Sequence, residues 1–107
     1  FIKVDIRFWT IVSAKPFKEA RHPAYIIQVD FGLETGIKKT SARITDYYNP
    51  EDLIGRQVLG VVNMPPKQIG PVMSDFLMLG FSAESDMHGK IVLASPDLPV
   101  PNGARLH

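Results

Sequence analysis

The sequence predicts an all-β domain with one short helix near its middle. Apolar and polar residues alternate over several short stretches, as they do on strands with one buried face. Between two such stretches the pattern becomes helical, with Asn49 as N-cap, Pro50 at the first helical position and Gly55 as the stop. The apolar run 58–62 follows. This layout is typical of a five-stranded antiparallel OB-fold barrel with the helix between strands 3 and 4.

Composition limits the classes of protein to which the chain can belong. Its 107 residues, 45% of them hydrophobic, are expected to form a single domain over 1–107 that needs no covalent staple. There is no cysteine, which excludes disulfides and thiolate metal sites and is compatible with a cytoplasmic protein. A net charge of +1 gives no global attraction to nucleic acid, so such binding needs a local patch. No apolar run approaches the ~20 residues of a membrane span and no leader-like segment is recognised, so we expect no membrane insertion.

The first strand begins with alternation over 4–8. Its pattern breaks at Trp9 and at the adjacent Ile11 and Val12. This break indicates a bulge, a strand buried on both faces or an aromatic residue that faces a partner. Further strands are expected over 24–31, 37–44, 57–62 and 76–81, with a short sixth strand or a paired arm over 91–94.

Glycines and prolines predict the connections. The link from Gly32 to Gly36 is short enough to make its flanking strands a hairpin. Segment 64–71 contains three prolines and is expected to be a stiff loop, because proline cannot donate to a sheet ladder. Segment 95–103 also contains three prolines and ends in the turn signal Asn102-Gly103. We therefore expect an extended C-terminal arm that wraps the barrel.

Short fragments in a fixed order over 4–106 resemble the CsaA family, which comprises small export-related chaperones built on a tRNA-binding OB domain that is also appended to methionyl-tRNA synthetases. The fragments are Asp5-Ile6-Arg7, Pro16 to Ala24, Asp30-Phe31-Gly32, Gly36-Ile37-Lys38, Ser41 to Thr45, Pro50 to Val58, Val61-Val62-Asn63, Pro65-Pro66, Ser74-Asp75 and Val100 to Gly103. The resemblance implies an OB barrel with added terminal elements, a homodimer, and binding of tRNA or of unfolded polypeptide.

The chain departs from the family pattern at two places. Phe8 and Trp9 replace a usual Val-Gly pair, which puts two large rings where a small residue permits close backbone approach. Met73 replaces a usual basic residue, which removes a phosphate contact and leaves an adaptable apolar side chain. The second departure favours peptide binding over nucleic-acid binding.

Candidate nucleic-acid-binding residues are cations and hydrogen-bonding groups from two segments: Lys38, Lys39, Arg43, Asn63, Lys67 and Ser74. Segment 35–45 contains three cations and no acid, so it could follow a phosphate backbone. A solvated strand face explains the same pattern about equally well. A second basic group, for which a solvated loop is the simpler explanation, lies between the first two predicted strands: Lys15, Lys18, Arg21 and His22.

Candidate peptide-binding residues are apolar side chains in and after the proline-rich segment: Met64, Met73, Phe76 and Met78. Methionine is flexible and polarizable, which suits irregular apolar partners. Alternating residues of a strand usually belong to the core, and this alternative is favoured for Phe76 and Met78. Met64 and Met73 lie in predicted loops and are expected to be exposed.

Catalysis is not indicated. The histidines His22, His88 and His107 are scattered without zinc-like spacing, and there is no nucleophile motif or glycine-rich phosphate loop. We expect a non-enzyme with no cofactor and no metal. Two hypotheses remain: a homodimeric chaperone that binds unfolded or export-bound polypeptides without ATP, with additional tRNA binding, or a tRNA-binding module that serves as an accessory factor.

Overall fold

A computed structural model describes residues 4–19, 23–32, 36–45, 47–82 and 91–107. Strands dominate these residues, and the helix is a single turn. In chain order the elements are β1 (Ile6–Pro16), β2 (Tyr25–Asp30), β3 (Ile37–Ala42), α1 (Pro50–Leu53), β4 (Gln57–Val61), β5 (Lys67–Ile69), β6 (Val72–Ser74), β7 (Leu77–Met78), β8 (Gly80–Ser82) and β9 (Ile91–Leu93). The predicted all-β class and the position of the helix are confirmed.

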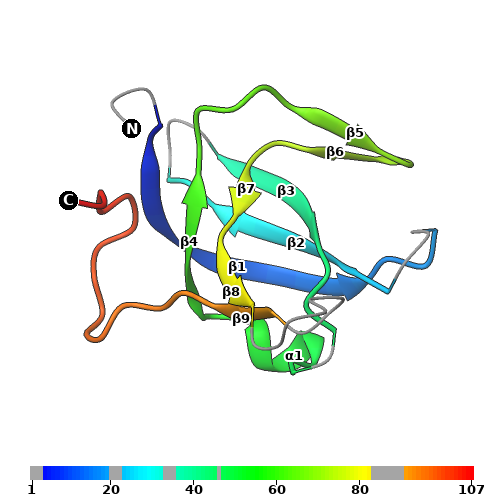
Figure 1. The fold of residues 1–107 in the computed structure, drawn as a ribbon, viewed down its shortest axis with the longest axis horizontal. Helices are drawn as coiled ribbons and strands as arrows, with labels where there is room; N and C mark the ends of the chain where they lie inside the picture. The colour runs from blue at the N-terminus through cyan, green and yellow to red at the C-terminus, as the bar shows by residue number, and fades with distance from the viewer. Residues whose placement is uncertain (1–3, 20–22, 33–35, 46, 83–90) are drawn as a thin grey trace.

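The principal sheet is antiparallel and has the strand order β3-β2-β1-β4-β7. It curves into a nearly closed barrel (Figure 1). The closing contact joins the two ends of the sheet, because the Asp75 backbone N–H, just before β7, donates to the Lys39 carbonyl of β3 at 2.8 Å. The predicted five-stranded OB-fold barrel is confirmed.

A bulge in β1 lets this strand serve both halves of the barrel. β1 pairs with β4 through Ile6 to Thr10 and with β2 through Thr10 to Pro16. The β2 register shifts between Ile11 and Ser13, so Val12 is an extra residue, and its side chain is 40% exposed. Of the three explanations for the broken alternation at Ile11 and Val12, the structure selects the bulge.

Three aromatic rings form the centre of the core. The Trp9 and Phe31 ring centroids lie 4.3 Å apart, and those of Phe31 and Phe76 lie 5.1 Å apart, both in edge-on geometry. Trp9 is 8% exposed and pairs with Val58 of β4, so its ring packs within the chain's own core and not against a partner. Gly60 makes room for this cluster, since a Cβ there would lie 3.2 Å from the Phe76 ring.

The helix is held by backbone contacts, and its side-chain cap is missing. The Asn49 carbonyl accepts from the Asp52 N–H at 3.0 Å, but the Asn49 side chain does not cap α1. Leu53 is fully buried, and the Gly55 N–H donates to the Ile11 carbonyl at 2.8 Å. These contacts fix the start of β4 against β1.

Two sequence expectations differ from the structure. Segment 64–71 was expected to be a loop, but it leads into the β5–β6 hairpin. The prolines do not prevent this pairing, because Pro65 and Pro66 precede β5 and Pro71 lies in the turn, where no ladder hydrogen bond is needed. The strand expected over 76–81 is divided into β7, which pairs with β4, and β8, which pairs with β9.

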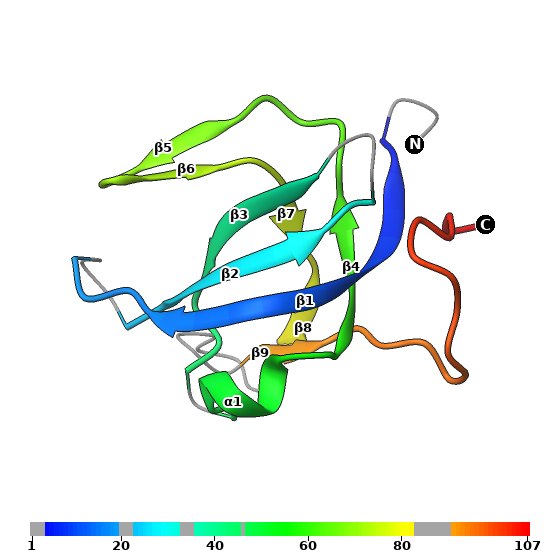
Figure 2. The same ribbon diagram turned by 180° about the vertical axis from the view of Figure 1, so that it is seen from behind.

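The C-terminal arm, residues 94–107, returns to the beginning of β1, as both views show (Figures 1 and 2). Phe8 N–H donates to the Ala104 carbonyl at 3.0 Å, Gly103 N–H to the Phe8 carbonyl at 2.8 Å, and Leu106 N–H to the Ile6 carbonyl at 2.9 Å. Gly103 has φ of +89°, which permits the turn that directs the arm onto β1. The predicted extended arm is confirmed.

An ion pair links the arm to β1. Arg7 Nε donates to Asp5 Oδ1 at 2.8 Å, and Arg7 Nη1 donates to the Gly103 carbonyl at 3.3 Å. Arg105 Nε lies 3.9 Å from the same Asp5 oxygen. The hydrogen bond from Arg7, together with the positive charges of Arg7 and Arg105, holds the pKa of Asp5 below its usual value of 3.8.

We predict a pH-dependent stabilisation from Asp5. Because the pKa of Asp5 is lower in the folded state, its contribution is complete above pH 3.8 and is lost as pH falls through the folded-state pKa. Thermal unfolding of the wild type and Asp5→Asn should therefore differ at neutral pH and converge in acid. A difference that stays constant from about pH 6 to about pH 2 would contradict this assignment.

Candidate binding surface

The side chains of the first three strands divide into an inward and an outward set. On β2, Tyr25, Ile27 and Val29 are buried, whereas the residues between them are half-buried. Strand pairing aligns the outward residues in rows across the sheet. We call their surface the outer sheet face and define it by Ser13, Lys15, Ile26, Gln28, Lys39 and Ser41.

One end of the outer sheet face is bordered by residues 17–19, which follow β1, and by the β5–β6 hairpin, and both project on the same side of the barrel (Figure 2). A second, small core joins them, in which Phe17, Ala24 and Val72 are buried and Ile26 packs against them. The Phe17 ring also contacts the hairpin turn, since a Cβ on Gly70 would lie 3.6 Å from Phe17 Cζ. This packing fixes the hairpin at the edge of the face.

The structure separates two of the predicted cations and adds another. Lys39 pairs with Gln28 and points outward, whereas Lys38 pairs with the buried Val29 and belongs to the inward set. Adjacent residues of a strand face opposite sides, so Lys38 and Lys39 cannot contact one phosphate row together. Lys15 lies on the outer sheet face instead, opposite Ile26.

The cations around this surface are free of acidic partners within the described part of the chain. Lys39 and Arg43 are exposed, with Arg43 just beyond the end of β3, and Lys67 is exposed on β5. Neither these three residues nor Lys15 forms an ion pair with any described residue. Such cations retain their full attraction for an anionic ligand.

Two predicted polar contacts lie elsewhere. Ser74 is 9% exposed, its hydroxyl oxygen lies 2.7 Å from that of Thr40, and it donates to the Phe76 carbonyl at 3.2 Å. Ser74 therefore joins β6 to β3 within the barrel and does not lie on the outer sheet face. Asn63 is exposed, and its Oδ1 accepts from the Asp5 N–H at 2.8 Å, so it contacts the start of β1.

The predicted apolar group is also divided. Met64 and Met73 are 47% and 45% exposed, and Met73 lies on the hairpin opposite Gln68. Phe76 is 4% exposed and belongs to the aromatic core, while Met78 is partly buried against the same core. The burial of Phe76, between β6 and β7, and the partial burial of Met78 favour the core alternative for both residues, which leaves Met64 and Met73 as the exposed candidates.

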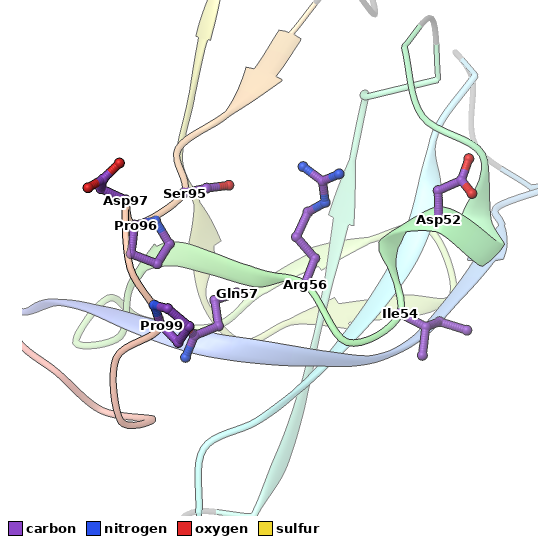
Figure 3. Close-up of a pocket in the computed structure, with 8 residues that line it drawn as sticks. All are labelled: Asp52, Ile54, Arg56, Gln57, Ser95, Pro96, Asp97 and Pro99. Atoms are coloured by element: carbon purple, nitrogen blue, oxygen red, sulfur yellow. The ribbon is translucent and has the colours of Figure 1, made fainter.

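Two clefts were not anticipated from the sequence, because residues far apart in the chain line each of them. The larger, about 550 Å³, lies between α1 and the arm. Its lining residues include one cation, Arg56, and two acids, Asp52 and Asp97, which Figure 3 labels. Because the two carboxylates outnumber the guanidinium, the cleft does not suit a phosphate. The second cleft, about 320 Å³, separates the end of β3 from β7, β8 and β9, and Arg43 is among its lining residues.

The described residues were also compared with the requirements of a metal site and of a membrane span. Within the described residues, no group of three His, Cys, Asp or Glu side chains could hold a metal ion. Nor does any helix among the described residues have the length and hydropathy of a membrane span. The features that stand out are a cationic sheet face, an exposed methionine on a fixed hairpin, and a backbone-paired arm.

Comparison with known proteins identifies the family. The family model described as "Putative tRNA binding domain" matches residues 6–105. The crystal structure of the chaperone CsaA from Bacillus anthracis is 46% identical with a TM-score of 0.90, and the match covers 100% of this chain and 94% of that one. The chain belongs to the CsaA family of tRNA-binding domains. CsaA from Picrophilus torridus is 37% identical, with a TM-score of 0.89 and the same coverage of both chains.

The domain also occurs within larger enzymes. The methionine–tRNA ligase of Flavobacterium johnsoniae is 30% identical over 107 residues, which are 100% of this chain and 14% of the ligase. Methionine–tRNA ligase 1 of Bacillus anthracis is 33% identical over 106 residues, 99% of this chain and 15% of that enzyme. The chain thus spans only a small part of these ligases, and matches them in this domain alone.

We predict that Ser74 contributes to stability. Ser74→Ala leaves the buried Thr40 hydroxyl without its partner and should lower the free energy of unfolding by about 1–3 kcal/mol. Urea denaturation measures this loss. Adding Thr40→Val removes the unpaired hydroxyl as well, so the double variant should lose less than the sum of the single variants. Additive losses, or a change below about 0.5 kcal/mol for Ser74→Ala, would contradict this role.

Proposed function

We propose that the protein is a non-enzymatic, homodimeric chaperone of the CsaA type, which binds unfolded or export-bound polypeptides in the cytoplasm without ATP. The observation that carries this proposal is the match to a protein named chaperone CsaA at 46% identity, which covers 94% of that chain. The β5–β6 hairpin supplies a suitable contact, because Met73 is exposed on it and Phe17 and Val72 fix its position. An exposed thioether adapts to many apolar segments.

We also propose that the protein binds tRNA through the outer sheet face. The support is the tRNA-binding family match over residues 6–105 together with the cations Lys15, Lys39 and Arg43, which form no ion pair with another described residue. Cations spread over a sheet can follow the shape and phosphates of folded RNA without reading base sequence. The net charge of +1 then matters little, because the positive charge is local.

The tRNA proposal is tested by titration at several salt concentrations. Lys39→Ala with Arg43→Ala should weaken tRNA binding and reduce the slope of log affinity against log salt by about two, one for each lost phosphate contact. Lys38→Ala is the matched control, since Lys38 lies on the inward side of the same strand. Equal effects of the control and the double variant, or tRNA affinity that does not change with salt, would exclude this site.

The polypeptide proposal is tested with a permanently unfolded protein, reduced and carboxymethylated α-lactalbumin. Met73→Ser should weaken its binding about fivefold, which corresponds to the loss of about 1 kcal/mol of apolar contact. Ile54→Ser is the control, because Ile54 is 55% exposed but lies at the end of α1. Fluorescence anisotropy measures both. If the two substitutions act alike, the hairpin is not the contact.

We base the dimer proposal on exposed apolar residues of the β8–β9 sheet and of β7. Phe81 and Val92 face each other across β8 and β9 and are 66% and 42% exposed, and Leu77 of β7 is 47% exposed. Exposed apolar groups of this size are typical of surfaces that a second copy covers. Sedimentation velocity should show a dimer at micromolar concentration and a shift toward monomer in Phe81→Glu. A wild type that sediments only as a monomer would contradict the proposal.

A further inference from the structure

One stretch of the β1 edge is occupied by the chain's own arm. β2 pairs with β1 only from Thr10 onward, and the N–H and carbonyl groups of Ile6 and Phe8 face the same edge before that point. β4 occupies the opposite edge. The arm pairs with Ile6 and Phe8, and Arg7 and Arg105 lie directly opposite each other in an antiparallel bridge. We call this stretch of the edge, residues 6–8, the β1 slot.

The arm is held mainly by backbone and polar contacts. Its two leucines, Leu98 and Leu106, are 71% and 49% exposed, so they bury little apolar surface. The Gln57 side chain instead bonds the Val100 backbone twice, with Nε2 donating to the carbonyl at 2.6 Å and Oε1 accepting from the N–H at 3.1 Å. A segment that buries few apolar side chains opens at a lower free energy than the core does.

Opening of the arm would expose a binding site of definite chemistry. The β1 slot would present the unpaired N–H and carbonyl groups of Phe8 and the carbonyl of Ile6, the features of a sheet edge that accepts an added strand. The Trp9 ring lies beneath the arm, since a Cβ on Gly103 would be 3.4 Å from Trp9 Cη2. The open slot therefore combines the backbone hydrogen-bonding groups of Ile6 and Phe8 with the edge of the Trp9 ring that Gly103 covers in the closed state.

We propose that the β1 slot is a docking site for an extended segment of an unfolded polypeptide, and that the C-terminal arm is its resident occupant, which the polypeptide displaces. This inference rests on the proposed chaperone function and specifies where it acts. The arm itself shows the geometry that fits: an extended chain, antiparallel to β1, held through main-chain hydrogen bonds. Main-chain hydrogen bonds are the same for nearly every sequence, as a chaperone with many clients requires.

A disulfide that locks the arm tests the proposal. Leu106 N–H donates to the Ile6 carbonyl and Phe8 N–H to the Ala104 carbonyl, which makes Arg7 and Arg105 a non-hydrogen-bonded antiparallel pair. The Cα atoms of such pairs lie about 4.5 Å apart, within the range that a disulfide spans. The chain contains no cysteine, so Arg7→Cys with Arg105→Cys creates one defined bond.

The locked and unlocked forms of this variant are compared with the unfolded α-lactalbumin probe. Oxidation should weaken binding about tenfold or more, and reduction by dithiothreitol should restore it. Affinity for tRNA, measured on the same samples, is the control and should not change with the redox state. If both forms bind the probe equally, the β1 slot is not the docking site, but the chaperone proposal stays in place. Absence of probe binding by the variant and by the wild type overturns both.

Hydrogen exchange on the unmodified protein gives an independent result. Saturation with the probe should remove protection from the arm amides of Gly103 and Leu106, while the Phe8 amide stays protected because the polypeptide replaces its acceptor. Retained protection of the arm amides overturns the proposal. If protection of these amides changes with protein concentration in the absence of the probe, the slot is occupied by the arm of a second copy. That result also overturns the proposal.

Discussion

The fold depends on one long strand that must satisfy its backbone groups along both edges. The first half of β1 pairs with β4 and with the arm, and its second half pairs with β2, so both parts of the barrel share this strand. A straight strand cannot follow both partners around a small barrel, and the extra residue Val12 supplies the required change of direction. Burial of Ile11 beside the bulge keeps the core continuous across it.

Two kinds of recognition follow from this arrangement. The outer sheet face offers separated charges, and the attraction of charges for phosphate is screened by salt. The β1 slot offers hydrogen bonds of the main chain, which depend little on salt and on the sequence of the bound segment. The face lies across the exterior of β1, β2 and β3, whereas the slot lies along the edge of β1 before β2 begins. The two proposed activities therefore use different parts of one small chain.

Local signals predicted the strands, the hairpin at Gly32 to Gly36, the helix and the arm, because period-two alternation, helix capping and turn residues act over a few neighbouring positions. The hairpin formed by β5 and β6 was missed, since strands of three residues are too short to show alternation. The burial of Ser74 depends on Thr40, which lies 34 residues away, and no local pattern records that contact.

The binding surface was predicted less completely than the fold. Lys38 and Lys39 were grouped because they are adjacent in sequence, yet adjacency in a strand is the reason that they face opposite sides. The alternation of side chains along each strand also places most residues of the core on one face of the sheet and most residues that can contact a ligand on the other. Outward positions such as Gln28, Lys39 and Ser41 can therefore vary among related chains at little expense in stability. Evolution is free to redirect such a barrel toward new ligands without first rebuilding its interior.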